Sequence, residues 1–213
     1  MLTVNEIFHS IQGESSYAGL PCVFVRLTAC DLRCSWCDTA YAYSEGRKRD
    51  VDDVLAEVAS YGCRLVEVTG GEPLLQPDVY PLMRHLLDAG HDVLLETAGH
   101  VSLERVPAGV VRIMDVKCPG SCESEKTDWD NLSRLGVRDE VKFVIADRRD
   151  YEFASDVVKR HDLASHVANV LFSPVYGQMS PADLAAWVLA DSLPVRLQLQ
   201  VHKLIWGPNT RGV

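Results

Sequence analysis

The sequence lacks the features that mark membrane, secreted and nucleic-acid-binding proteins. No segment approaches about 18 uninterrupted apolar residues, so we expect no transmembrane helix. The first ten residues carry neither a basic n-region nor an apolar run, which favours a cytoplasmic location. Lysine and arginine number 21 against 30 aspartate and glutamate, a formal net charge of -9. Without a broad basic surface, we expect neither nucleic acid nor a membrane as a partner.

Low-complexity linkers and fixed-period repeats are also absent, so the 213 residues predict one domain over residues 1–213. Only residues 118–131, "CPGSCESEKTDWDN", look like a long polar loop. Elsewhere, strand patterns alternate with helix patterns, which predicts an α/β fold with a mostly parallel sheet. The expected strands are 22–27, 64–69, 92–97, 109–117, 139–146, 167–175 and 194–201, and the expected helices are 52–61, 78–90, 151–161 and 181–190.

Chemically distinctive residues gather where the expected strands end. Ligands of parallel sheets bind beyond the carboxyl ends of the strands, so we predict the functional site at that edge. The segments concerned are 30–39, 69–73, 96–99, 115–117, 173–176 and 200–202.

Three of the seven cysteines fall within residues 29–39, "ACDLRCSWCDT". A reducing cytoplasm disfavours disulfides, so this group is expected to hold metal or do chemistry. The C-x3-C-x2-C spacing supplies three thiolates, whereas a closed zinc site takes four ligands. A fourth ligand would complete a zinc knuckle, and a 4Fe-4S cluster could instead leave one iron open to an exogenous ligand. The candidates for a fourth ligand are Cys22, Cys118, Cys122 or a nearby histidine.

The segment "TGGEP" at residues 69–73 is the second distinctive motif. Its two glycines lack Cβ atoms, so the backbone there can lie close against a ligand. Taken alone, the segment favours a plain strand-to-helix turn that has Pro73 near the first helical position.

Together these motifs resemble the radical S-adenosylmethionine (SAM) superfamily, whose members share the cysteine spacing after a strand and a Gly-Gly-Glu motif. The segments "EIFHSIQGE", "FVRLTACDLRCSWCDT", "LETAG" and "VHKLIWGPNTRGV" resemble the 7-carboxy-7-deazaguanine synthase family within it, essentially from end to end. The resemblance implies a shortened, incomplete (β/α) barrel of the radical SAM type.

The activity implied by the resemblance is that of a carbon-nitrogen lyase in queuosine and 7-deazapurine biosynthesis. It converts 6-carboxy-5,6,7,8-tetrahydropterin to 7-carboxy-7-deazaguanine with loss of ammonia. The implied cofactors are a 4Fe-4S cluster, SAM and Mg²⁺. A radical derived from SAM takes a hydrogen from substrate C6, and SAM is regenerated. The implied partners are the small pterin substrate, a flavodoxin-like or other reductant, and a second copy in a homodimer.

The resemblance also implies roles for individual residues. Cys30, Cys34 and Cys37 would hold the cluster, and Thr39 would bind Mg²⁺. The residues implied to bind SAM are Trp36, Cys37, Asp38, Gly71, Glu72, Asp115, Val116, Lys117, Ser173, Pro174, Val175 and Tyr176. The residues implied to contact substrate are Ile11, Gln12, Gly13, Glu14, Arg26, Thr69, His202 and Val213.

Two segments depart from the family's usual pattern. Residues 115–117 are Asp-Val-Lys where relatives often have Ser-Pro-Lys, so only the lysine carries over. Residues 96–99 are Glu-Thr-Ala-Gly where relatives have Asn or Ser at the third position, and Ala98 is given no role.

Structural alternatives stand beside these assignments. Arg26 can pair with a substrate carboxylate or with an internal acid, and His202 can be a buried structural histidine. Thr39 can cap a short helix near Ala40 instead of binding a metal. Two other classes also remain open: another radical SAM enzyme, such as a glycyl-radical activase, and a zinc-stabilised binding module completed by the cysteines of residues 118–122.

Overall fold

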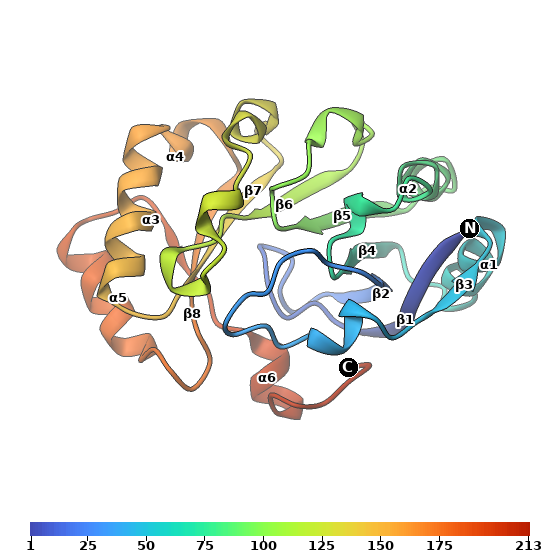
Figure 1. Ribbon diagram of the computed structural model, residues 1–213, viewed down its shortest axis with the longest axis horizontal. Coiled ribbons are helices and arrows are strands. Elements are labelled where there is room, and N and C mark those ends of the chain that lie inside the picture. The colour runs from blue at the N-terminus through green and yellow to red at the C-terminus, as the bar shows by residue number, and fades with distance from the viewer.

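The computed structural model describes residues 1–213 as an α/β fold around one nine-stranded sheet (Figure 1). The strands are β1 (Leu2–Ile11), β2 (Pro21–Leu27), β3 (Arg47–Arg49), β4 (Leu65–Gly70), β5 (Asp92–Thr97), β6 (Val111–Asp115), β7 (Glu140–Ile145), β8 (Asn169–Pro174) and β9 (Arg196–Leu197). The α-helices are α1 (Val51–Ser60), α2 (Val79–Asp88), α3 (Arg148–Arg160), α4 (Leu163–His166), α5 (Pro181–Ala190) and α6 (Val201–Trp206).

The strand order is β3-β1-β2-β4-β5-β6-β7-β8-β9, and every pair from β2 to β9 is parallel. The two ends of the sheet do not pair with each other, so the barrel is open. This confirms the predicted α/β class and the shortened, incomplete (β/α) barrel. None of the helices combines the length and the apolar character that a membrane span requires.

The central strands are apolar on both faces because both faces are covered. One face packs under helices α1 to α5 in a cluster of 37 buried residues, and Figure 1 shows these helices around the outside of the sheet. The inner face carries a smaller cluster of seven buried residues, including Phe24, Leu94 and Ile113. Side chains along a strand alternate between faces, so Arg26, Glu96 and Asp115 lie on this same inner face, one step nearer the carboxyl ends. On the inner face, a layer of apolar side chains therefore lies beneath a layer of polar side chains at the carboxyl ends of the strands.

Three parts of the sequence prediction need correction. Residues 2–11 form β1, antiparallel to β2, so the strand before the cysteines is not the first. The expected long loop contains three 3₁₀ helices: η4 (Pro119–Ser121), η5 (Ser124–Lys126) and η6 (Trp129–Arg134). The expected strand at 194–201 shrinks to β9, because the chain leaves the sheet after Gln198 bonds to Phe172 and Val201 then donates to Gly13 O.

Candidate active site

The cysteine loop, residues 29–39, follows β2, and backbone hydrogen bonds hold its start against the turn after β4. Gly71 N donates to Leu27 O at 3.0 Å, and Glu72 N donates to Ala29 O at 2.8 Å. A Cβ atom on Gly71 would lie 2.2 Å from Ala29 O and 2.8 Å from Cys30 Cβ. A Cβ atom on Gly70, where φ is +151°, would lie 2.2 Å from Leu27 O. Both glycines are thus required by close contacts within the protein's own chain, and both also line the cavity, where the expected contact with a ligand stays a prediction.

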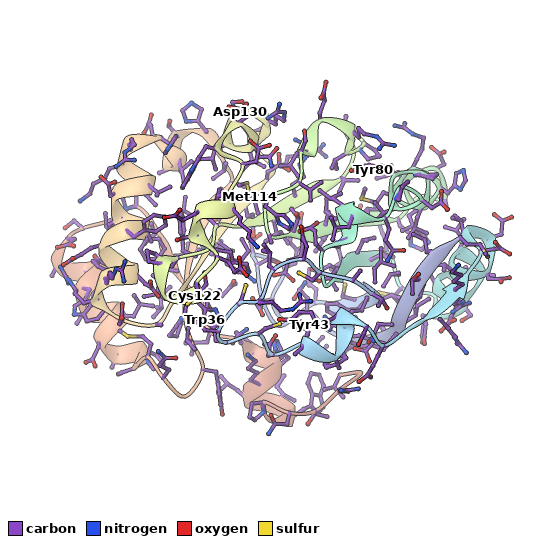
Figure 2. All side chains as sticks on the ribbon, viewed as in Figure 1. Trp36, Tyr43, Tyr80, Met114, Cys122 and Asp130 are labelled. Atoms are coloured by element: carbon purple, nitrogen blue, oxygen red, sulfur yellow. The ribbon has the colours of Figure 1, made fainter.

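Three free thiols, those of Cys30, Cys34 and Cys37, line one cavity of about 520 Å³ at the carboxyl ends of the strands. Figure 2 shows Trp36 and Tyr43 on this loop, with Cys122 near Trp36. No group of three or more His, Cys, Asp or Glu side chains converges closely enough to hold a single metal ion. Three partly exposed thiols around a cavity fit a larger iron-sulfur cluster, which uses thiolate ligands.

None of the other candidate cysteines completes a four-ligand zinc site with the cysteine loop. Cys22 and Cys118 are completely buried, each within one of the two apolar clusters, whereas Cys122 is exposed. The structure therefore contains no closed four-ligand site.

Most of the predicted site residues meet in the same cavity. Those that line it are Ile11, Gln12, Gly13, Glu14, Arg26, Cys30, Cys34, Trp36, Cys37, Asp38, Thr39, Thr69, Gly71, Asp115, Lys117, Val175, Tyr176, His202 and Val213. They come from the turn after β1, from the ends of β2, β4, β6 and β8, and from α6 and the C-terminal tail.

Four predicted SAM-binding residues, Glu72, Val116, Ser173 and Pro174, do not line this cavity. The Glu72 carboxylate is fully buried and accepts hydrogen bonds from Leu74 N, Ala98 N and Thr97 Oγ1 at 2.8–3.0 Å. It therefore ties the turn after β4 to the end of β5. Ala98 contributes a backbone N–H to this tie, which needs no polar side chain.

Arg26 pairs with an internal acid, which is one of the two alternatives that the sequence left open. Its Nε donates to Glu6 Oε1 at 2.8 Å, and Tyr41 donates to the same oxygen at 3.1 Å. Neither Nη atom donates to a protein acceptor, and Arg26 lines the cavity. The internal acid thus anchors one edge of the guanidinium and leaves the other edge for an anion.

His202 and Thr39 have fewer protein partners than their structural alternatives require. His202 is half-buried, makes no hydrogen bond, and packs so tightly on Gly13 that a Cβ there would lie 2.1 Å from its Nδ1. Burial lowers the pKa of His202 more than nearby Glu14 raises it, so the ring is neutral near pH 7. Thr39 precedes η1 (Ala40–Tyr43) but makes no capping hydrogen bond, and its Oγ1 lies 3.8 Å from Cys37 Sγ.

The sequence prediction gave no role to three charged residues of the inner face, Glu67, Glu96 and Lys142, although Glu96 falls within the predicted segment 96–99. Lys142 ion-pairs with Glu14 at 2.8 Å, with Glu96, and with Asp115 at 3.8 Å. The available signal was a single charge inside the apolar runs "LVEVTG" and "EVKFVI", where a buried charge needs a partner.

The charges of this layer shift one another's pKa values. Burial, the largest single effect, would raise the pKa of Glu14. The charges of Lys142 and His202 and the hydrogen bonds from Lys142 and Gln200 together outweigh it and lower that pKa to about 2. Burial, together with the charges of Glu96 and Glu14, raises the pKa of Glu67 well above its usual value. Gln12 joins these two acids, because its Nε2 donates to Glu67 and its Oε1 accepts from Glu14 N at 2.9 Å.

Comparison with known proteins gives the same picture. Residues 25–112 match the family model described as the radical SAM superfamily. The chain is 49% identical to the 7-carboxy-7-deazaguanine synthase of Koribacter versatilis, with 100% of both chains covered. It is 44% identical to that of Chlorobaculum tepidum, covering 100% of this chain and 97% of the relative. The crystal structure of QueE from Escherichia coli superposes with a TM-score of 0.73 and 24% identity, covering 94% of each chain.

The open parallel barrel and its three-cysteine loop therefore define a radical SAM protein. More particularly, the full-length similarity shows that the chain belongs to the 7-carboxy-7-deazaguanine synthase family.

Proposed function

We propose that the protein converts 6-carboxy-5,6,7,8-tetrahydropterin to 7-carboxy-7-deazaguanine with loss of ammonia, as a radical SAM carbon-nitrogen lyase. The proposal rests on family membership and on one observation: a single cavity is lined both by the cysteine loop and by charged side chains of both signs. Arg26 comes from β2, and Glu96 comes from β5, where Lys142 joins it to Glu14.

This polarity suits the substrate. Its carboxylate would pair with the free edge of Arg26, and the N–H donors of its 2-aminopyrimidinone ring would meet the carboxylates of Glu14 and Glu96. Arg26 on β2 and Glu96 on β5 are two strand spacings apart in the sheet, roughly 10 Å. That span is comparable to the length of a carboxylated bicyclic ring. The rest of the substrate pocket would be formed by Ile11, Gly13, Thr69, His202 and Val213.

Cys30, Cys34 and Cys37 would hold the 4Fe-4S cluster, and one iron would stay open for SAM. When bound, the cluster and SAM supply the one-electron chemistry that removes the hydrogen from substrate C6. The chain's own task is to hold both partners in reacting geometry and keep water out. Lys203 of α6 supports this by pairing with Asp38 Oδ2 at 2.6 Å, which fixes the cysteine loop against the C-terminal segment.

The SAM site would use Trp36, Asp38, Gly71 and Lys117 from the cavity wall, together with residues 173–176. Lys117 Nζ donates to Asp115 Oδ2 at 2.7 Å, so an aspartate paired with this lysine stands where relatives often have serine. A reductant of the flavodoxin type, a cytoplasmic location and a homodimer belong to the same proposal.

Thr39 would bind Mg²⁺ through its hydroxyl, a hard oxygen donor of the kind that this ion prefers. The substrate carboxylate lies beside a cluster and its thiolates, and an unpaired anion there is costly. Arg26 offers one positive charge, and a bridging Mg²⁺ would offer two more. The Thr39 hydroxyl is free for this because it makes no capping hydrogen bond.

The test is anaerobic turnover of the reconstituted protein with SAM, a reductant and the carboxytetrahydropterin, followed by mass analysis. We expect 7-carboxy-7-deazaguanine and ammonia in equal amounts. A fully loaded protein that cleaves SAM but forms no deazaguanine would refute the proposed function.

A further inference from the structure

Lys142 is the buried cation at the centre of the polar layer. Its side chain is only 5% exposed, and its Nζ donates to Glu14 Oε2 at 2.8 Å and to Glu96 Oε1. These acids come from the turn after β1 and from the end of β5, whereas the lysine is on β7. The Lys142 ammonium therefore joins three segments of the chain. Glu14 lies 128 positions from Lys142 in the sequence, and Glu96 lies 46 positions from it.

The third acid near Lys142 does not depend on it. Asp115 lies 3.8 Å from Lys142 Nζ but receives a hydrogen bond from Lys117 at 2.7 Å. Glu14 and Glu96, by contrast, have no other cationic partner among the hydrogen bonds and ion pairs of the chain. Their remaining protein donors are neutral: Gln200 Nε2 to Glu14 at 2.8 Å, and Thr69 Oγ1 to Glu96 at 3.3 Å.

Two of the three donors of Lys142 bond to protein carboxylates, those of Glu14 and Glu96, so the lysine can act on a ligand through them. An ammonium has three donors and no acceptor, and each carboxylate oxygen can accept more than one hydrogen bond. Glu14 and Glu96 thus keep acceptor capacity on the cavity side while one oxygen of each is fixed by Lys142. Without the cation, two neighbouring and partly buried carboxylates would repel each other, and nothing would fix the orientation of either one.

Resting on the proposed function, we propose that Lys142 is a positioning residue for substrate recognition: it holds Glu14 and Glu96 as ionised, oriented acceptors for the N–H donors of the 2-aminopyrimidinone ring. It touches neither the reacting carbon nor the cysteine loop. Its removal is therefore expected to weaken substrate binding and selectivity while leaving SAM binding intact.

The test is a mutant cycle on the reconstituted, SAM-loaded protein, with substrate affinity measured anaerobically by calorimetry. The variants are Lys142→Met, the pair Glu14→Gln with Glu96→Gln, and the triple variant; Lys159→Met, on the exposed side of α3, is the matched control. We expect Lys142→Met to weaken substrate binding about tenfold or more, since hydrogen bonds to charged groups are lost. In the double-glutamine background the same change should weaken binding less than about threefold, because its targets are gone.

A second readout separates positioning from mere stability. Wild type should bind the substrate more tightly than an analogue that lacks the 2-amino group, and Lys142→Met should reduce that preference toward unity. Because this variant leaves two partly buried carboxylates without a cation, its fold is checked by thermal melting. If it does not fold, the comparison of the double and triple variants decides the matter, because the triple variant leaves none of the three charges unpaired.

Three results would overturn the inference: wild-type affinity in Lys142→Met, an undiminished loss in the double-glutamine background, or an unchanged preference for the 2-amino group. Failure of the proposed function looks different, because wild type itself would then neither bind nor convert the carboxytetrahydropterin.

Discussion

At the residue scale, the seven cysteines fall into distinct environments. Cys22 and Cys118 are buried in apolar clusters, whereas Cys30, Cys34 and Cys37 are partly exposed on one loop beside the cavity. The loop's shape is held by backbone hydrogen bonds and by glycine contacts. The thiols themselves are thus available for ligation without being needed for packing.

Cys34→Ala is therefore expected to abolish cluster binding while preserving the fold. The Cys34 side chain makes no hydrogen bond and belongs to neither apolar cluster. Iron content, visible absorbance and the thermal melt measure the two effects separately. Cys122→Ala, a change at an exposed cysteine outside the cavity lining, should keep full iron content. Retention of the cluster and of SAM cleavage in Cys34→Ala would show that the ligand assignment is wrong.

Thr39→Ala tests the proposed magnesium site. Replacing a helix-capping threonine by alanine typically lowers the free energy of unfolding by about 1 kcal/mol. Since Thr39 makes no capping bond, we expect the melting temperature to stay near the wild-type value. Turnover after chelation should rise on adding magnesium in wild type, and this response should be weaker in the variant with its cluster intact. Identical magnesium curves for the two proteins would remove Thr39 from the metal site.

At the scale of elements, the alternation of strands and helices could be predicted because each parallel strand is an apolar run between turn signals. β1 was missed because polar residues such as Asn5, Glu6 and Ser10 interrupt its apolar pattern. The polar 118–131 segment gave no sign of its 3₁₀ turns, which are fixed by bonds to distant elements, such as Gly120 N to Asp150 at 2.7 Å.

The residues of the candidate site could also be predicted only in part. The cysteine loop and the Gly-Gly-Glu turn are local in sequence, so their spacing identified them. The contacts of Lys142 are not local, since its partners lie 128 and 46 residues away. A charge within an apolar run shows that a partner must exist, but only the fold of the sheet determines which one. Glu67 was missed, and Glu96 was left without a role, for the same reason.

Gly71→Ala tests how the turn after β4 supports the cysteine loop. The added Cβ would lie 2.2 Å from a backbone oxygen, and backbone cannot swing aside as a flexible side chain can. We expect destabilisation of about 1–3 kcal/mol, as for overpacking, and a reduced iron content. Gly136→Ala is the control, because its nearest neighbour would be 3.9 Å away. Equal melting temperatures and iron contents in the two variants would contradict this account of the turn.

At the scale of the whole molecule, the C-terminal segment contacts N-terminal segments of the chain at the candidate active site. Val201 N donates to Gly13 O at 2.9 Å, Lys203 pairs with Asp38, and Arg211 pairs with Glu45 at 2.9 Å. Figure 1 shows α6 and the C-terminus beside the segment that follows β2. The C-terminal segment thus joins the turn after β1 to the cysteine loop. The single domain over residues 1–213 stays a prediction.

The most direct test of the central claim follows the hydrogen at substrate C6. Anaerobic turnover is run with substrate deuterated at C6, and the product, SAM and 5'-deoxyadenosine are quantified by mass spectrometry. If the cavity presents C6 to SAM as proposed, deuterium will appear in the SAM pool, and 7-carboxy-7-deazaguanine will form without stoichiometric 5'-deoxyadenosine. Deuterium confined to the substrate and product, or one 5'-deoxyadenosine accumulated for each turnover, would contradict the account.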